Sequence, residues 1–247
     1  MSRENTYHSI ILKKQPYGEG DEIITVFTQE SGKLRFMGKS TKLAKSKLQY
    51  SLQTLFLVKL TATTSSSLGK IIGAEVLQTF ANIRENLACM NAAFFALELL
   101  IKFTPDEQKN EQLYTLFITF FGFLNSLRNR DNVLDVGLAK FKIQFLKDLG
   151  FAIGYPSAAV KAASIGFSNS RGGFVENSVG ADSVPVKTEI FDQFIQLQKI
   201  SFDDILTQIS QTENVPDKNL AELNQLLNNF IRYQLERDIK SERFLKL

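Results

Sequence analysis

Apolar residues change their spacing once along this chain, near residue 80, and that change constrains the fold more than any other feature. Before it, short runs that alternate apolar and polar residues are separated by turn-forming sequences, a pattern typical of small β-barrels and sandwiches. After it, apolar residues recur at steps of three and four, which marks the buried faces of α-helices. The pattern predicts an α+β protein with a strand-rich domain at residues 1–80 and a mainly α-helical domain at residues 81–247.

The first domain is predicted to hold five strands. Residues 16–20, Pro-Tyr-Gly-Glu-Gly, separate the first two, and residues 30–32, Glu-Ser-Gly, form a tight hairpin turn before the third. Five strands in about 75 residues fit an OB-type β-barrel, which binds nucleic acid on one sheet face and with its loops, although an SH3-like barrel would give a similar pattern. The predicted strands are residues 8–14, 22–28, 33–39, 53–60 and 70–77.

Helical spacing dominates the second domain, beginning with apolar residues at positions 87, 90, 94, 97 and 101. A second helix is predicted to start at Thr104, because Thr104 can cap it, Pro105 suits its first turn and Glu107 completes a capping box. Residues 151–186 show neither period and contain two adjacent glycines and two prolines, which predicts an irregular insert. Further helices are predicted at residues 131–149, ended by Gly150, and at residues 188–199, 202–209 and 217–235.

Composition bounds the class of protein. With 247 residues, of which 44% are hydrophobic and 22% charged, the chain is expected to be a soluble globular protein of one or two domains. No apolar run reaches the length that spans a bilayer, and the polar N-terminal sequence has no signal-peptide core, so a cytoplasmic protein without a membrane partner is expected. The single cysteine, Cys89, excludes an internal disulfide and a zinc site built from cysteines.

Residues that could support catalysis are few. His8 is the only histidine, and the sequence nominates no nucleophile or orienting partner for it. Cys89 sits among apolar helix residues, where a buried and inert thiol is expected. The acidic pairs 106–107 and 203–204 lie near predicted helix starts, where the helix dipole explains them without a metal. The sequence therefore predicts a binding protein without a catalytic site or a cofactor.

A basic stretch lies inside the strand-rich domain. Between residues 31 and 74 there are eight lysines and arginines and no aspartate or glutamate. A folded surface that is positive and free of carboxylates suits a polyanion such as a nucleic-acid backbone, although a solvated face that keeps a barrel soluble would have the same composition. Tyr17 and Tyr50, in predicted loops, are the best candidates for stacking on bases. The predicted phosphate contacts are Lys33, Arg35, Lys39, Lys42, Lys45 and Lys47.

Several segments, taken in order, resemble one family. They are residues 10–21 and 25–33, the basic stretch with Lys45-Ser46-Lys47, residues 52–56, 74–75, 80–87, 98–100 and 141–151, and the C-terminal sequence Ser-Glu-Arg-Phe-Leu at residues 241–245. Together they resemble the RecO family of bacterial recombination mediators. The resemblance covers nearly the whole chain, although no one of these segments is as specific as a catalytic motif.

The resemblance implies an OB domain followed by a helical domain, and a set of activities. RecO proteins bind single- and double-stranded DNA and anneal complementary strands. They contact the acidic C-terminal tail of single-strand-binding protein and, with RecR, help the recombinase to load on DNA. A bacterial cytoplasmic protein that associates with the nucleoid when active is therefore expected. For the tail, Lys140, Lys142 and Lys147 around Phe141 are candidates, although a solvated helix face would look the same.

The chain departs from one feature of that family. Many RecO proteins carry a four-cysteine zinc module after the helix that here ends at Gly150, whereas residues 155–183 contain no cysteine and no histidine. Zinc needs thiolate or imidazole ligands, so no metal is predicted. Two alternatives are expected for the insert: packing through Phe167 and Phe174 holds it, or it is partly mobile.

Two other functions fit the same residues. One is an RNA-binding OB-fold protein, which a preference between DNA and RNA of equal length would distinguish. The other is a protein–protein adaptor with little DNA affinity, in which the basic stretch only keeps the barrel soluble. The C-terminal Ser-Glu-Arg-Phe-Leu sequence favours the recombination mediator over both.

Overall fold

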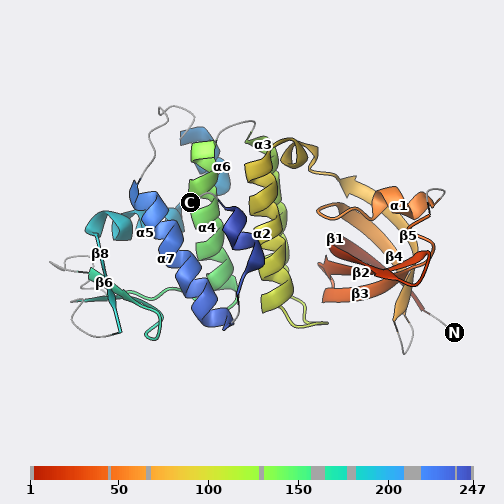
Figure 1. Cartoon of the computed structure of the whole chain (residues 1–247), viewed down its shortest axis with the longest axis horizontal. Coiled ribbons are helices and arrows are strands. Elements are labelled where there is room, and N and C mark those ends of the chain that lie inside the picture. The colour runs from red at the N-terminus through yellow and green to blue at the C-terminus, as the bar shows by residue number, and fades with distance from the viewer. Residues whose placement is uncertain are drawn as a thin grey trace. The chain divides into compact units, whose positions relative to one another are not determined.

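The computed structural model describes residues 3–43, 46–64, 68–127, 131–156, 165–176, 182–208, 218–236 and 238–245. It shows the predicted class, a closed five-stranded barrel followed by a mainly helical region (Figure 1). The chain forms two compact units, of which the first comprises residues 1–81 and 96–115 and the second residues 82–95 and 116–247. The first unit therefore includes a segment, residues 96–115, that the sequence pattern assigned to the helical domain.

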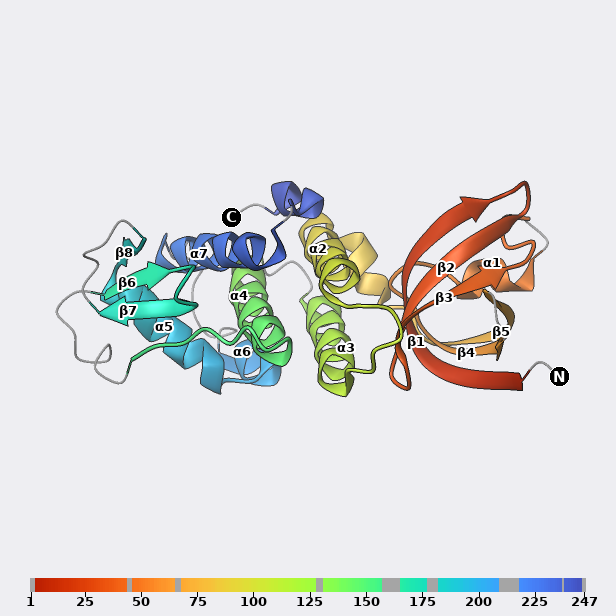
Figure 2. The same cartoon turned by 90° about the horizontal axis from the view of Figure 1, so that it is seen from below.

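Five strands close the barrel in the order β1-β2-β3-β5-β4 (Figure 2). They are β1 (Arg3–Tyr17), β2 (Asp21–Thr28), β3 (Gly32–Gly38), β4 (Leu57–Thr64) and β5 (Gly69–Gln78). Neighbouring strands are antiparallel except β3 and β5, which run parallel. The long strand β1 pairs with β4 through its first half and with β2 through its second half. Because one strand serves both neighbours, the sheet closes into the OB-type barrel that the sequence predicted.

The fourth strand starts later than predicted, at Leu57 rather than residue 53. The apolar residues before it are not part of the barrel wall. Leu52 and Phe56 belong to the barrel core, and they follow a short helix, α1 (Lys47–Ser51), that the sequence pattern did not predict. An apolar run that fills the core from a loop cannot be distinguished from a buried strand by composition alone.

Phenylalanines dominate the core of the second unit. Its main helix, α4 (Asp131–Asp148), contacts α5 (Thr188–Lys199), α6 (Phe202–Gln208) and α7 (Lys218–Leu235), and the prediction of these four helices is confirmed. The ring of Phe120, in α3 (Glu111–Ser126), stacks on that of Phe141 with 4.2 Å between centroids. Phe117 meets Phe141 edge-on at 5.3 Å. Stacked and edge-on contacts of this kind add to the gain from apolar burial.

The helix predicted to start at Thr104 starts instead at Glu111. Thr104 continues the end of α2 (Leu87–Phe103), because its backbone N–H donates to the carbonyl of Leu100 at 3.2 Å. The cap of α3 is Asn110, whose Oδ1 accepts the N–H of Leu113 at 2.9 Å. The capping-box reading of residues 104–107 was therefore wrong, and these residues belong to a loop that packs on the barrel.

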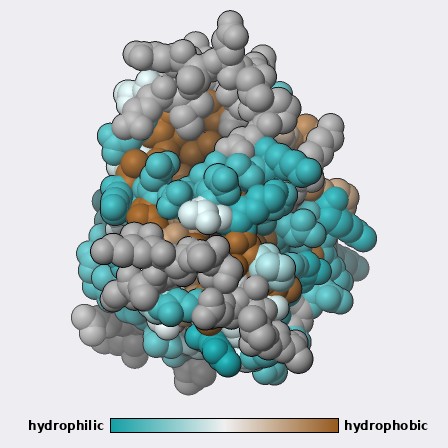
Figure 3. Space-filling model, turned by 90° about the vertical axis from the view of Figure 1, so that its left-hand side faces the viewer, coloured by the Kyte–Doolittle hydropathy of each residue, from teal (hydrophilic) through white to brown (hydrophobic). Residues whose placement is uncertain are grey.

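The described parts of residues 151–186 form a small sheet, so the prediction of an irregular insert is corrected. Strands β6 (Ile165–Ser168), β7 (Gly173–Glu176) and β8 (Val184–Val186) pair in the order β7-β6-β8. Phe167 and Phe174 are buried and meet edge-on at 5.2 Å, as the packing prediction required. The side of the second unit that carries this sheet shows apolar surface between hydrophilic side chains (Figure 3).

The described residues form neither a metal-binding cluster nor a membrane-spanning helix. No three side chains of His, Cys, Asp or Glu among them come together as a metal site requires. No helix within the same ranges is long and apolar enough to cross a membrane. Cys89 is buried at 2% exposure, as predicted.

Candidate nucleic-acid interface

The outer face of β1, β2 and β3 is defined by the strand register. Ile24, Val26 and Phe36 are buried in the barrel core, so the residues next to them in sequence point outward. The outward residues form four rows across the strands. In order along the barrel these rows are Ile10, Phe27 and Lys33; then Lys13, Thr25 and Arg35; then Gln15, Ile23, Met37 and Lys70; and last Tyr17 and Asp21.

One end of this face is covered. Ile10 and Phe27 are fully buried, and the ring of Phe27 lies 6.5 Å from that of Tyr114 near the start of α3. Gly32, at the start of β3, lies so close to the loop before α3 that a Cβ there would come within 1.9 Å of the Gln108 carbonyl oxygen. The loop therefore closes this end of the face against any ligand.

The rest of the face is accessible, and we call it the open face. Its outermost side chains, including the Tyr17 ring at 55% exposure, present cations and an aromatic surface to solvent. Ile23 and Met37 are half-buried between them and give the middle of the face an apolar character. The open face comprises Lys13, Gln15, Tyr17, Asp21, Ile23, Arg35, Met37, Lys39 and Lys70, with the buried Thr25 between Lys13 and Arg35.

Lys33 has a structural position, which argues against its predicted role as a phosphate contact. Its ammonium group donates to the carbonyls of Ile101, at 2.8 Å, and Thr104. These carbonyls lie at the C-terminal end of α2, where the helix leaves acceptors unpaired and carries negative partial charge. With its side chain 11% exposed, Lys33 cannot reach a phosphate without giving up both bonds.

Carboxylates from outside the basic stretch reach its cations. Asp106, in the loop after α2, lies 3.1 Å from the Arg35 guanidinium, and Asp21 lies 3.5 Å from the Lys39 ammonium. A stretch that is free of acids in the sequence is therefore partly neutralised in space. Both cations are largely exposed, at 59% for Arg35 and 60% for Lys39, so each pair contributes little to stability and can exchange its carboxylate for another anion.

The turn between β1 and β2 is joined to the segment after β3. Asp21 accepts the backbone N–H of Ser40 at 2.8 Å, and this bond, with the nearby Lys39, holds the pKa of Asp21 below its ordinary value. The Lys42 ammonium donates to the Gly18 carbonyl at 2.9 Å. These bonds place Lys42 beside the open face, at the end that carries Tyr17.

The two predicted stacking residues lie on different elements. Tyr17 is on the open face, whereas Tyr50 lies on α1 with its ring edge-on to Phe56 at 5.8 Å. Tyr50 is 66% exposed, but it belongs to none of the rows of the open face. Lys45 and the side chain of Lys47 lie outside the described residues.

Three of the four candidates for binding a partner's tail are buried. Phe141 is fully buried, Lys140 is 7% exposed and Lys142 is 0% exposed. The Lys140 ammonium donates to the Gln198 carbonyl at 3.3 Å, and burial and the nearby Lys147 lower its pKa. Only Lys147 is exposed. The burial of Lys140, Phe141 and Lys142 argues against their role as contacts for the tail.

Two family models match the chain from one end to nearly the other. The first, described as Recombination protein O N terminal, matches residues 1–80, and the second, described as Recombination protein O C terminal, matches residues 84–243. The chain belongs to the RecO family. This membership confirms the resemblance found in the sequence and assigns the chain to DNA repair and recombination.

Curated RecO proteins are similar along most of their length. The DNA repair protein RecO of Dehalococcoides mccartyi (strain CBDB1) is 26% identical over 245 residues, which cover 94% of this chain and 91% of that protein. The protein of the same name from Halalkalibacterium halodurans is 25% identical over 239 residues, covering 96% and 92%. That of Bacillus cereus (strain B4264) is 24% identical over 244 residues, covering 96% and 94%.

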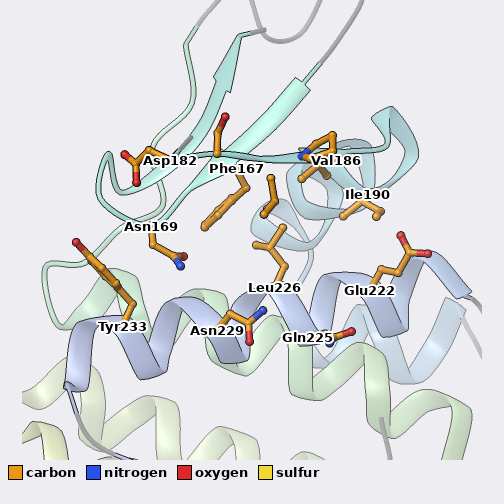
Figure 4. A pocket seen from close by; sticks show the side chains of 13 residues that line it. Phe167, Asn169, Asp182, Val186, Ile190, Glu222, Gln225, Leu226, Asn229 and Tyr233 are labelled. Atoms are coloured by element: carbon orange, nitrogen blue, oxygen red, sulfur yellow. The ribbon is translucent and has the colours of Figure 1, made fainter. Parts of the chain in front are cut away.

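This RecO chain also has a pocket of about 430 Å³ in its second unit (Figure 4). Phe167 of β6 and Val186 of β8 line it from one side and Leu226 of α7 from the other, which makes part of its lining apolar. Its charged lining residues are acidic, Asp182 and Glu222, and Glu222 is paired with Lys187 at 2.8 Å. No lysine or arginine is among the lining residues of this pocket, so the lining offers no cation for a phosphate.

Sequence reasoning missed several residues of the open face. Lys13, Ile23, Met37 and Lys70 were not among the predicted contacts, although all four lie in its rows. Alternation within the strands that carry them, β1, β2, β3 and β5, could have identified them, because residues two apart share one face of a strand. Asp106 had no comparable signal, since it lies 71 positions after Arg35 in the sequence.

Proposed function

We propose that this RecO family member is a recombination mediator that binds single- and double-stranded DNA through the open face and anneals complementary strands. One observation carries the proposal: the accessible half of the β1–β3 face combines an exposed tyrosine and two half-buried apolar residues with cations along its border. Proteins that bind single strands without sequence preference combine the same two elements, a cationic track and an aromatic platform.

The proposed mechanism begins with the exchange of ionic partners. Phosphates would replace Asp106 on Arg35 and Asp21 on Lys39, while Lys13, Lys42 and Lys70 would contact further phosphates. Each contact releases counterions from the strand, so the affinity falls as salt rises. Five such contacts give a slope of log affinity against log salt of roughly −3.5 on a single strand.

Strand annealing follows from contacts that leave base edges free. Tyr17, Ile23 and Met37 can support the faces of bases, and no side chain is required to read their Watson–Crick edges. A second strand brought to the same surface meets screened phosphates and unpaired bases. The protein then lowers the repulsion between strands without any covalent step, which agrees with the proposal that it is not an enzyme.

The same proposal includes two protein partners, RecR and the tail of single-strand-binding protein. It also includes an activity, help with loading the recombinase on DNA. An acidic tail with an apolar end requires an apolar surface bordered by cations. Lys140, Phe141 and Lys142 do not provide that surface, because they are buried. Of the predicted tail contacts, Lys147 alone is accessible to a partner.

One observation favours the adaptor as a second candidate function. Arg35 and Lys39 already have carboxylate partners, so the net positive charge available to DNA is smaller than the sequence suggested. An adaptor would bind its protein partners and would show little affinity for DNA. An RNA-binding protein would instead prefer RNA over DNA of equal length at the same salt concentration.

Binding of labelled single-stranded DNA across a salt series tests the proposal. The test variant changes Lys13, Lys39 and Lys70 to glutamine. The control variant changes three exposed lysines elsewhere to glutamine and so removes the same total charge. These lysines are Lys59, Lys199 and Lys218. Losing three phosphate contacts should reduce the slope by about 2 in the test variant only. Equal slopes in both variants, or weak binding by the unchanged protein, would reject the open face as the DNA site.

A further inference from the structure

The loop between α2 and α3, residues 104–110, brings one carboxylate to the border of the open face. Asp106 Oδ2 lies 3.1 Å from Arg35 Nη2, and Asp106 Oδ1 lies 3.4 Å from Lys33 Nζ. The backbone holds this position: the Glu107 N–H donates to the Lys33 carbonyl at 2.9 Å, and Asp106 and Lys33 form a parallel β-bridge. The carboxylate is therefore presented by an anchored segment and not by a free side chain.

Of the two cations near Asp106, only Arg35 is available to a ligand. The Lys33 ammonium already donates to two carbonyls at the end of α2 and is nearly buried. Arg35 is 59% exposed, and its guanidinium is a planar donor that fits carboxylates and phosphates in the same way. Asp106 thus occupies, on Arg35, the position that a DNA phosphate would take.

We infer that Asp106 competes with DNA phosphates for Arg35 and limits the affinity of the open face. The inference rests on the proposed function, because it concerns regulation of the same site. Asp106 also ends the DNA path, since beyond it the outer face is covered by the loop and by α3. A strand that extends past Arg35 meets a negative charge and a closed surface.

The test compares Asp106→Asn with Glu75→Gln in the full chain. Both changes remove one negative charge, and Glu75 is exposed on β5 outside the rows of the open face. Asparagine keeps the shape of the side chain and leaves the backbone bridge intact. Anisotropy of a labelled single-stranded oligonucleotide at low salt should show about two- to five-fold tighter binding for Asp106→Asn, the range expected when an exposed ion pair is removed. Glu75→Gln should change it less.

A second pair of variants isolates the role of Arg35. In an Arg35→Ala background, Asp106→Asn should give no more gain than Glu75→Gln gives, because the competing pair is absent. Unfolding followed by circular dichroism checks that all variants fold. Equal gains from both charge changes, or an equal gain with and without Arg35, would overturn the inference while leaving the DNA site in place. A protein that binds no DNA in any variant would instead reject the proposed function.

Discussion

Lys142 is predicted to destabilise the protein at neutral pH. Its side chain is fully buried in the second unit, where Nζ donates to Asn224 Oδ1 at 2.8 Å and lies 5.5 Å from the centre of the Phe95 ring. Burial lowers the Lys142 pKa from the ordinary 10.5 to about 7, although the charges of Glu242 and Asp135 act in the opposite direction. A buried ammonium with one neutral hydrogen-bond partner is poorly compensated for its lost hydration.

The size of the effect follows from proton binding in the two states. Between pH 7 and 10.5 the unfolded chain holds a proton on Lys142 that the folded protein has largely released, so stability rises with pH in this window. The cost grows as pH falls from 10.5 and reaches about 4 to 5 kcal/mol near pH 7, at 1.36 kcal/mol for each pH unit. At pH 10 the same cost is below about 1 kcal/mol.

Replacing Lys142 with methionine should therefore have opposite effects at the two pH values. The substitution removes the ionisation cost but leaves the buried Asn224 oxygen without its donor, which costs roughly 1 to 3 kcal/mol at any pH. We expect Lys142→Met to be more stable than the unchanged protein by about 1 to 4 kcal/mol at pH 7. At pH 10 it should be less stable, because the lost hydrogen bond then outweighs the small ionisation cost that remains.

Urea unfolding followed by circular dichroism at several pH values measures this difference. Other groups titrate over the same range, but they are common to both proteins and cancel in the comparison. Lys147→Met, an exposed change on the same helix, is the control and should alter stability little at either pH. A Lys142→Met variant that is destabilised as much at pH 7 as at pH 10 would refute the reasoning.

Two further predictions concern packing and the position of Lys33. A Cβ on Gly137 of α4 would lie 2.1 Å from Phe123, so Gly137→Ala should lower the free energy of unfolding by about 1 to 3 kcal/mol. Gly122→Ala in α3 should instead raise the free energy of unfolding by up to about 1 kcal/mol, because a Cβ there would meet no outside atom within 4 Å. Thermal unfolding that showed the same effect for both substitutions would contradict this packing. Lys33→Met should lower stability by roughly 1.5 to 3 kcal/mol in urea unfolding, because two helix-end carbonyls lose a charged donor. It should leave DNA affinity unchanged, whereas a loss as large as that of Lys39→Gln would show that Lys33 contacts DNA.

Local periodicity accounts for the parts of the fold that the sequence predicted. Helix α5 was predicted with its observed bounds because its buried residues recur at helical steps. The ends of β2 and β3 were predicted to within one residue because turn residues mark the hairpin between them. The errors arose where a residue's neighbours in space are distant in sequence. Leu52 and Phe56 looked like strand residues because nothing local shows that they fill the barrel from a loop.

The candidate site was only partly predictable for the same reason. A positive stretch is visible in the sequence, but Asp21 and Asp106 meet Lys39 and Arg35 only after the barrel and the loop have formed. Lysine in a helix is expected to face solvent. Lys142 departs from that expectation because α4 is surrounded by other helices, and helical spacing alone does not reveal how many neighbours a helix has.

Photo-crosslinking tests the central claim most directly, because it reports which surface touches DNA. Single-stranded DNA substituted with 5-bromouracil would be irradiated with the unchanged protein, and the crosslinked peptides identified by mass spectrometry. The account predicts crosslinks on the open face, at Tyr17 and on the peptide that carries Met37. Crosslinks confined to the β4 side of the barrel or to the helices of the second unit would contradict it.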